Sequence, residues 1–412
     1  MLPKHLHLLL LAAAVSSLSA CGSSSSDSSD DTAEEEHEHS QRLLYSDNNA
    51  SDLMVFDHSE EAFELVGQAS EVATRLIKAD DGLTAAVISS TGVQFVNGGV
   101  EEHDESETDT EEEHEEASLL DLTITRDDPQ VVMTANHYAV LNDGNTDFYP
   151  ASTLEDATGA DEDISIEGYT QTAPALILDE EHGLYALFDG DSVDVYEGTE
   201  ATDVNFDCAD FGTVVHSGSL ALIQCGSTIN YLLLQEDETS GEAVVNYGDS
   251  GITGTVLGMQ AAGGLGLVYT SGMAYVVHGH DDHVHAEDSG LSLENDQQIC
   301  LAAMNPTGGF LLAIRDDATG AVIDLAEDDA TATVSITLTD ATENFSCDNL
   351  TVGAADEAFM LADSDSGSLY VIDAHDGGTF HLHGVEEFPA STSIASAVLL
   401  SPTDAETDHV HE

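Results

Sequence analysis

Short apolar segments recur along this chain about every 45 residues, and this repeat limits the folds that the chain can adopt. Each unit opens after a glycine or an acidic turn and continues through a turn into a second apolar segment and then a third. The units show the features of strands rather than a helical period. The eight openings are Leu43–Ser46, Leu83–Ile88, Tyr138–Leu141, Leu184–Phe188, Leu220–Ile223, Leu265–Tyr269, Phe310–Ile314 and Phe359–Ala362.

Several short strands per unit, separated by Gly and Asp turns, predict an all-β fold. Eight such units indicate an eight-bladed β-propeller over residues 41–402, with seven blades as the alternative if one short unit merges with its neighbour. The segment Ser391–Ser401 has the character of a lone inner strand, whereas the first unit begins with what is a second strand elsewhere. We therefore expect the two ends of the domain to complete one blade and close the ring.

The first twenty residues have the features of a signal peptide. Lys4 supplies a positive charge, Leu8–Val15 an apolar run, and Leu18–Cys21 resembles a bacterial lipobox. That resemblance implies a lipidated Cys21, and Gly22 after it favours the periplasmic side of the outer membrane. We expect residues 21–40 to be a flexible Ser/Asp/Glu/His-rich tether, residues 403–412 to be an acidic tail containing histidine, and the lipid to be the sole membrane contact.

The formal net charge of −75 excludes nucleic acid and an anionic membrane surface as partners, because the protein would repel them. Cations remain favourable partners, and we expect a monomer. Acidity also keeps a protein soluble in salt water, and this alternative explains the bulk charge. It does not explain nineteen histidines in a chain with only six lysines and arginines.

Four cysteines remain if Cys21 carries lipid, an even number that predicts two disulfides in an oxidising compartment. The preferred pairs are Cys208 with Cys225, which bracket one predicted strand pair, and Cys300 with Cys347, which occupy matching positions in successive repeats. The other two pairings stay open. A zinc–thiolate site is the functional alternative, although no CxxC pair occurs.

Most of the histidines fall at one phase of the repeat. With strands named A to D from the axis outward, the A-to-B and C-to-D turns lie on the same face of a propeller, and the tails adjoin that face. Chance clustering is the alternative to a common metal-binding surface. The pattern includes His58, His103, His114, His278–His285 and His375 at C-to-D turns, His137, His182 and His216 at A-to-B turns, and His37, His39, His409 and His411 in the tails. His381 and His383, on the predicted outermost strand of the last blade, fall outside it.

The densest cluster is the segment His278–His285. Alternate residues of a strand point the same way, so we expect His278 and His280 to form one pair and His283 and His285 another, with Asp281 and Asp282 between them. Imidazole and carboxylate are ligands that zinc and related divalent ions accept. The alternative is a solvated polar loop.

The remaining candidate ligands are weaker. His103 and His114 flank an acidic insertion, and His37 and His39 lie in the tether, where a flexible segment can raise the local ion concentration. His137 and His216 are expected near the axis, where a histidine with an ordinary structural role is the alternative. An unstructured charge run is the alternative for the insertion.

Part of the chain resembles the AztD-type periplasmic zinc metallochaperones. The resemblance covers the stretch from Glu102 through His114 to Asp128–His137 and Gly144, and the surroundings of Cys208 and Cys225. It implies a propeller that carries zinc to the solute-binding protein of an ABC importer. It also implies metal roles for His103 and His137 and, more loosely, for His114 and His216. The chain departs from the family at Asn136 and Glu181, where doubled histidines are frequent.

These features together predict a zinc-binding periplasmic lipoprotein that captures and transfers or buffers the ion. Other divalent metals would fit the same ligands, and copper would bind them more tightly. An interaction scaffold that uses no metal is the alternative. We expect no enzymatic activity, since the sequence contains no G-x-S-x-G motif, phosphate loop or defined acid/base pair.

Overall fold

The computed structural model describes residues 41–100, 115–236, 242–280, 282–294, 296–325, 331–338, 345–375, 379–389 and 392–403. Almost all of these residues belong to strands or turns, and the helical elements among them are two 3-10 turns, Ala151–Thr153 (η1) and Cys347–Asn349 (η2). Within the described ranges no helix is both long and apolar enough to cross a membrane.

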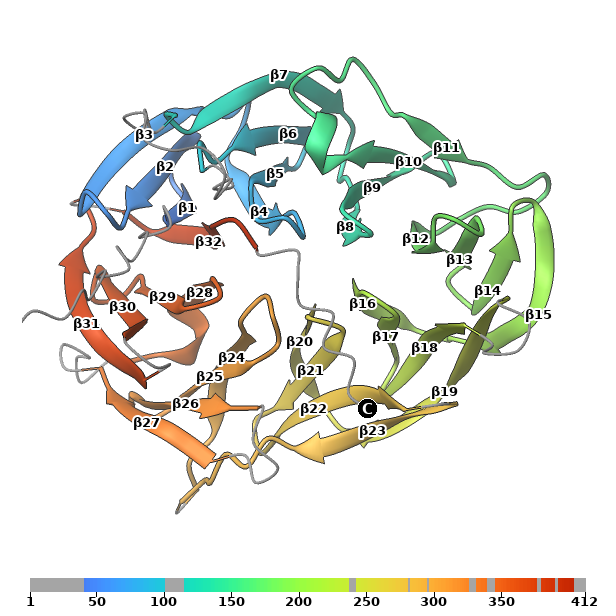
Figure 1. The fold of residues 1–412 in the computed structure, drawn as a ribbon. Coiled ribbons are helices and arrows are strands. Elements are labelled where there is room, and N and C mark those ends of the chain that lie inside the picture. The colour runs from blue at the N-terminus through green and yellow to red at the C-terminus, as the bar shows by residue number, and fades with distance from the viewer. Residues whose placement is uncertain are drawn as a thin grey trace, which may run out of the picture. The chain divides into compact units, whose positions relative to one another are not determined.

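The strands form eight four-stranded antiparallel sheets, which are the blades of an eight-bladed β-propeller (Figure 1). From the axis outward, blades 1 to 4 are β32 (Ile394–Leu400), β1 (Arg42–Asp47), β2 (Asp52–Asp57) and β3 (Ala62–Gln68); β4 (Ala73–Lys78), β5 (Thr84–Ser89), β6 (Gly92–Asn97) and β7 (Ser118–Thr125); β8 (Val131–Thr134), β9 (His137–Asn142), β10 (Asn145–Pro150) and β11 (Glu162–Ile164); and β12 (Ala173–Asp179), β13 (Leu184–Phe188), β14 (Ser192–Glu197) and β15 (Glu200–Asp207). Blades 5 to 8 are β16 (Phe211–Ser217), β17 (Leu220–Cys225), β18 (Thr228–Glu236) and β19 (Ala243–Thr253); β20 (Val256–Ala262), β21 (Leu265–Thr270), β22 (Ala274–His280) and β23 (His283–Asp288); β24 (Ile299–Met304), β25 (Phe310–Arg315), β26 (Thr319–Asp324) and β27 (Thr331–Thr337); and β28 (Leu350–Ala354), β29 (Ala358–Asp363), β30 (Ser368–His375) and β31 (Thr379–Glu387).

The ring closes in blade 1, as the repeat pattern predicts. The last strand, β32, pairs antiparallel with the first, β1, so that Leu43 lies opposite Leu399 and Tyr45 opposite Ala397. The sequence-based prediction of eight blades is therefore confirmed, and the seven-bladed alternative is excluded. Closure from both ends of the chain ties blade 1 to blade 8, and it places residues from the two ends of the domain side by side.

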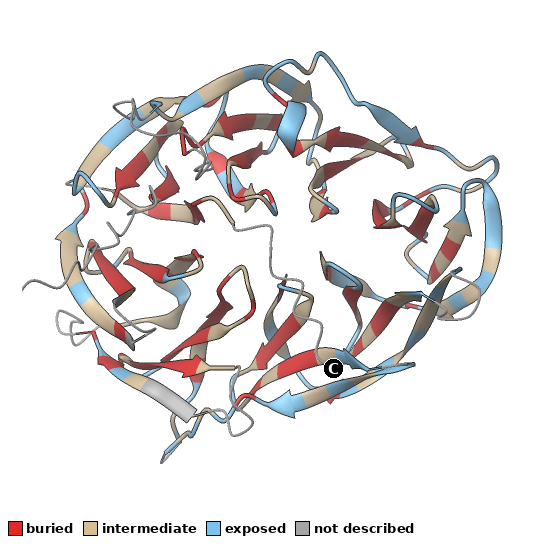
Figure 2. Cartoon of the chain, in the orientation of Figure 1, coloured by how far each residue is buried: buried red, intermediate tan, exposed pale blue. Residues whose placement is uncertain are grey.

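The hydrophobic core is divided among the interfaces between blades. One buried cluster lies at each interface, and that between blades 8 and 1 contains Leu43, Phe56, Met360, Val371 and Leu399. Figure 2 shows the buried residues concentrated in the inner and middle strands, while outer strands such as β15 and β23 are largely exposed. This gradient arises because the outermost strand of each blade pairs only with the strand on its inner side, and because its apolar and polar residues alternate.

Both predicted disulfides are present. Cys208 pairs with Cys225 within the cluster that joins blades 4 and 5, and Cys300 of β24 pairs with Cys347 of η2, which links blade 7 to blade 8. The other two connectivities are excluded, and so is a zinc–thiolate site at these four residues, because all four sulfur atoms are bonded in pairs.

A cavity of about 490 Å³ runs along the inner strands. Seven of the eight inner strands line it, whereas β12 does not. The reason lies in the neighbouring strands, since the Thr134 hydroxyl of β8 contacts Nδ1 of His216 on β16 at 3.1 Å and so bridges across the position of blade 4.

Candidate metal centre

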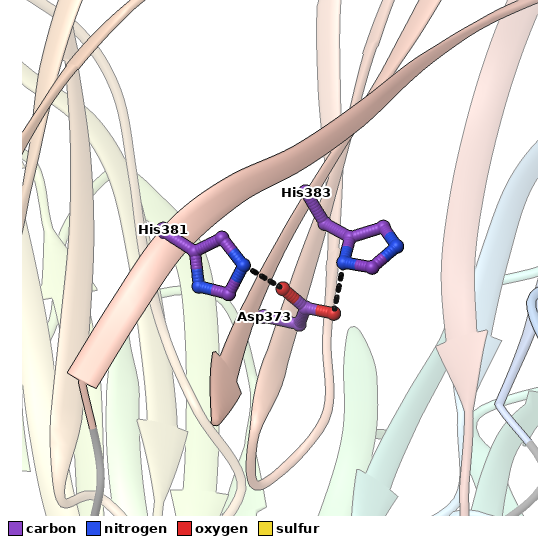
Figure 3. A group of neighbouring side chains, drawn as sticks. All are labelled: Asp373, His381 and His383. Atoms are coloured by element: carbon purple, nitrogen blue, oxygen red, sulfur yellow. Dashed lines mark ion pairs between the residues drawn. The ribbon is translucent and has the colours of Figure 1, made fainter. Parts of the chain in front are cut away.

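Four polar side chains from blades 8 and 1 gather beside the turn between β30 and β31. Oδ1 of Asp373 lies 3.7 Å from Nε2 of His381, and Oδ2 lies 3.4 Å from Nδ1 of His383 and 3.7 Å from Nε2 of His58. Figure 3 shows the rings of His381 and His383 on either side of the Asp373 carboxylate. We refer to these four residues as the interblade centre. In the described part of the chain, Asp373, His381 and His383 form the only group of three potential ligands whose donor atoms all lie within 4.8 Å of one another.

The pairing of β30 with β31 brings the blade 8 ligands together. Asp373 lies directly opposite His381 in the ladder, so their side chains share one face of the sheet. The register then shifts, because Ile372 faces Leu382 while Val371 faces Gly384. His383 is consequently the extra residue of a β-bulge, a feature that redirects a side chain and increases local twist.

The turn after β2 holds His58 in place. One oxygen of Asp57 accepts hydrogen bonds from the backbone N–H groups of Ser59 and Glu60, and the other accepts from Nε of Arg42 at 2.7 Å. Burial alone would raise the pKa of Asp57, but hydrogen bonds from Ser59 and Arg42, together with the charge of Arg42, hold the pKa below its usual value. The ionised carboxylate therefore closes the turn that begins with His58.

Arg42 connects this turn to blade 2. Its Nη1 donates to the backbone carbonyl oxygens of Gly98, Gly99 and Glu115 at distances of 2.6 to 2.9 Å. Arg42 and Asp57 are both buried, with side-chain exposures of 8% and 5%. Such an ion pair fixes geometry more than it adds stability, since both charges lose their water. It gives His58 a rigid support.

The separations in the interblade centre leave room for a shared metal ion. Bonds of about 2.0 to 2.2 Å around a tetrahedral ion place its ligand atoms about 3.3 to 3.5 Å apart. The observed distances of 3.4 to 3.7 Å run from Oδ1 of Asp373 to His381 and from Oδ2 to His383 and His58, and they exceed ordinary hydrogen-bond lengths. The donor atoms of Asp373, His381 and His383 lie within 4.8 Å of one another, so the ligands would draw closer around an ion. The Asp373 side chain is 11% exposed, whereas His381 and His383 are 44% and 43% exposed. A cation could therefore enter from solvent and meet a carboxylate that water screens little.

His381 and His383, which the histidine pattern of the sequence left out, lie beside Asp373 in the structure. They lie on the outermost strand, as predicted, but they are adjacent to the C-to-D turn, at the same edge as the other C-to-D histidines. The signal that could have found them is their i, i+2 spacing on a strand, the same pattern that identified His278 and His280. His58 could not be joined to them without the packing of blade 8 on blade 1.

The second group of histidines lies on the hairpin of β22 and β23 in blade 6. His278 lies opposite His285, and His280 opposite His283, so all four rings share one face of the hairpin. Ring centroids are 4.7 Å apart for His283 and His285, and 4.9 Å for His278 and His280. We refer to these four residues as the histidine hairpin. The two pairs predicted from strand alternation are thus adjacent, and they merge across the strands into one group.

Carboxylates flank the histidine hairpin without lying inside it. Oδ1 of Asp282 lies 3.0 Å from Nδ1 of His283, and Oε1 of Glu287 lies 3.9 Å from Nε2 of His278. Burial lowers the pKa of His278, as do the neighbouring rings of His280 and His285, while the charge of Glu287 opposes this change. His278 therefore favours the neutral ring, the form that coordinates metal. Asp281, also predicted as a ligand, lies outside the described residues.

The histidines predicted at the A-to-B turns do not join either group. His137 begins β9 and its Nδ1 contacts the backbone oxygen of Ala135 at 2.6 Å. His182 lies in the turn after β12, where Nδ1 contacts Oδ2 of Asp179 at 2.7 Å, and this hydrogen bond raises the pKa of His182. Both have the local contacts of ordinary turn residues.

His216 lies on β16 rather than in the turn after it, and it is buried. Burial lowers its pKa to about 4, so the ring is neutral at ordinary pH. Its Nδ1 contacts the Thr134 hydroxyl, which also bonds to the backbone of Ile177. His216 therefore joins blades 3, 4 and 5. The candidate ligands among the described residues thus form two separate groups, and His137, His182 and His216 belong to neither.

The remaining predictions fall outside the described residues. These are the ligands His37, His39, His103 and His114, the lipidated Cys21, the signal peptide, the tether and the tail beyond Thr403. They stay predictions.

No family model matches this chain, and no curated protein sequence matches it. Two solved structures of AztD from Citrobacter koseri, one of them the apo form, are similar to it in fold. The TM-scores are 0.67 for the apo form and 0.66 for the other, each at 14% sequence identity. The alignments cover 89% and 90% of this chain and 99% and 100% of the AztD chains. At this identity the likeness shows the architecture of the whole propeller and does not extend to individual ligands.

Proposed function

We propose that this protein binds zinc at the interblade centre and captures, buffers or transfers the ion in the cell envelope. One observation carries the proposal: the carboxylate of Asp373 in blade 8 lies 3.4 to 3.7 Å from imidazole nitrogens of His381 and His383 of the same blade and of His58 of blade 1. The ligands come from different blades and are held by a bulge and a buried ion pair. Such support is typical of a site in which the first ligands are oriented by their surroundings.

The donor set favours a borderline divalent ion. It combines three imidazoles with one carboxylate, whereas magnesium and calcium prefer sites made of oxygen alone. All four cysteines in the described residues are in disulfides, so thiolate-seeking ions find no ligand there. Copper would bind these ligands more tightly than zinc, and the choice between them would depend on supply and geometry. Zinc is our first candidate because of the resemblance of the sequence to zinc metallochaperones.

The exposure of the centre favours exchange over permanent retention. Two of the imidazoles are more than 40% exposed, so the ligands of another protein could approach a bound ion and replace them one at a time. The solute-binding protein of a zinc importer is the recipient that the family resemblance implies. The acidic surface would attract the cation over long distances.

The envelope location is the part of the proposal that rests on the sequence alone. It derives from the lipobox-like segment Leu18–Cys21. Replacing Cys21 with alanine should release the protein from the membrane fraction of a bacterial host, whereas an unchanged distribution would exclude the lipid anchor. This outcome is independent of zinc binding.

Titration of the purified full-length chain with zinc, in competition with a chelator of known affinity, tests the metal proposal. The variant Asp373→Asn keeps the shape of the side chain and removes its charge, and it should weaken the tightest site on the order of 100-fold. Asp179→Asn is the matched control, because Asp179 also contacts a histidine but only one, His182. It should leave the affinity unchanged.

A second variant distinguishes the loss of a zinc ligand from a folding defect. His381 is 44% exposed, so His381→Gln should fold normally and still weaken the tightest site. If Asp373→Asn and His381→Gln both bind zinc as tightly as the unaltered chain, the interblade centre is not the site and the proposal fails.

A further inference from the structure

The histidine hairpin places four imidazoles on one face of a single β-hairpin, far from blade 8 in the chain. His278, His280, His283 and His285 occupy two successive cross-strand pairs, so each ring has a neighbour along its own strand and another across the ladder. Ring centroids of neighbouring pairs are 4.7 to 6.3 Å apart. No residue of this group belongs to the interblade centre, which lies between blades 8 and 1.

The face of the hairpin opposite the histidines packs against blade 5, and this packing leaves the histidines on the exposed face. Gly279 lies opposite Val284 in the ladder, between the two histidine pairs, and both point to the other face. A Cβ atom at Gly279 would lie 2.5 Å from Cδ1 of Leu233, and Val284 packs on the same cluster of blade 5 residues. The hairpin is therefore seated on blade 5 by its small and apolar face, and the imidazole face remains outward.

The contacts of His283 set which of its nitrogens can act as a ligand. Oδ1 of Asp282 lies 3.0 Å from Nδ1 of His283, and a ring that donates its Nδ1–H to this carboxylate offers Nε2 as the metal ligand. That Nε2 lies 3.0 Å from Nε2 of His285. A carboxylate that holds one nitrogen of an imidazole while the other nitrogen faces a second donor is a common arrangement around metal ligands.

The separation of these two nitrogens is that of a hydrogen bond between the rings, and it is also close to the spacing of neighbouring ligands on one ion. Donors at about 2.0 Å from a metal lie about 2.8 Å apart in a square-planar site and about 3.3 Å apart in a tetrahedral one. The observed 3.0 Å lies between these values. His278 and His280 are the next rings on the same face; His280 is exposed, and its ring centroid lies 5.0 Å from that of His285.

We propose that the histidine hairpin is a second metal site, independent of the interblade centre, that binds one borderline divalent ion through imidazole nitrogens alone. His283 and His285 supply the first two ligands, His278 and His280 complete the set, and Asp282 orients His283. The site goes beyond the proposed function because it shares no ligand with it. Its all-nitrogen donor set suits copper and nickel as well as zinc.

The test counts ions bound to the full-length chain by equilibrium dialysis against zinc. The double variant His283→Gln/His285→Gln should bind one ion fewer than the unaltered chain at the same free zinc concentration. His182→Gln removes an exposed histidine that has only a carboxylate neighbour, and it should bind as many ions as the unaltered chain. Equal ion counts for the double variant and the unaltered chain would overturn the proposal.

Copper gives a second readout that separates the two sites. Electron paramagnetic resonance of one added Cu²⁺ equivalent in Asp373→Asn should show coupling to several nitrogens, and that signal should disappear when His283→Gln/His285→Gln is added. If Asp373→Asn loses no zinc while the hairpin variant loses one ion, the proposed interblade centre fails and the hairpin site stands. If the hairpin variant keeps the nitrogen-coupled signal, the hairpin site fails whatever the result for Asp373.

Discussion

The interblade centre and the histidine hairpin contain similar side chains but differ in what holds them. Asp373 is 11% exposed and receives imidazoles from two blades, whereas Asp282 is 86% exposed and contacts a histidine next to it in the chain. The centre therefore depends on the closed ring, and the hairpin depends on one local ladder. The comparison teaches that a cluster obvious in the sequence can be less preorganised than one assembled by tertiary packing.

A variant that loosens the support of the interblade centre alone should have the largest effect. Asp57→Asn removes the charge that pairs with buried Arg42 and should destabilise the protein by about 3 kcal/mol, because the cation remains buried. Denaturant unfolding measures this change. Zinc binding at the centre should weaken as the turn of His58 loosens, while the hairpin keeps its ion.

The control for that variant is the exposed ion pair of blade 3. Asp143 is 95% exposed beside Arg126, so Asp143→Asn should change the stability by less than about 1 kcal/mol. Equal losses of stability in the two variants would show that burial of the Arg42–Asp57 pair does not matter.

A buried histidine sharpens the contrast with the exposed ones. The pKa of His216 is about 4 in the folded protein, and the ordinary histidine value is 6.5. Between these two pH values His216 is protonated in the unfolded chain and neutral in the folded protein. The free energy of unfolding therefore falls as the pH drops from about 6.5 to 4. The loss amounts to roughly 3 kcal/mol for this group.

Unfolding free energies measured without metal across this pH range test the assignment. His216→Gln should flatten the dependence of stability on pH between about 6.5 and 4. A profile for His216→Gln that parallels that of the unaltered chain contradicts the assignment.

Zinc should stabilise the protein through the contact between blades 8 and 1. At a free concentration 100 times the dissociation constant, binding to the folded state alone adds about 2.7 kcal/mol. His58→Gln should reduce this gain by about 1.4 kcal/mol, which corresponds to a ten-fold weaker site. Thermal unfolding with and without zinc measures both values, and the same gain in the variant would exclude His58 as a ligand.

The two faces of the histidine hairpin should respond differently to substitution. Gly279→Ala brings a methyl group against Leu233 and should cost about 1 to 2 kcal/mol without metal. His283→Gln, on the exposed face, should change stability by no more than about 0.5 kcal/mol. Denaturant midpoints compare them, and a larger effect of His283→Gln would mean that the imidazole face is packed rather than open.

Local patterns in the sequence were sufficient for much of the fold. The alternation of apolar residues and the spacing of the units predicted eight blades, and the positions of Cys208, Cys225, Cys300 and Cys347 favoured the disulfides that are present. These features are repeated or lie in equivalent positions of neighbouring units, so the pattern itself carries the information. The grouping of the hairpin histidines followed from strand alternation for the same reason.

The interblade centre could not be predicted in this way. His58 and Asp373 lie near opposite ends of the propeller sequence, and only closure of the ring between β1 and β32 brings their blades together. The bulge that redirects His383 leaves no sign in the pattern of apolar residues. The sequence also did not reveal that His216 is buried, because its burial depends on β8 reaching β16 past the inner strand of blade 4.

The sequence by itself thus favoured eight blades over seven, the closure of the ring by both ends of the chain, the disulfide pairs that are present and one local histidine cluster. Tertiary structure alone decided which carboxylate meets which imidazoles between blades 8 and 1, and which histidine is buried. The physical reason is the different range of the interactions along the chain. Strand alternation and turns act between neighbours in the chain, whereas a metal ligand set requires ångström-scale convergence of side chains that only the register and packing of separate blades can position.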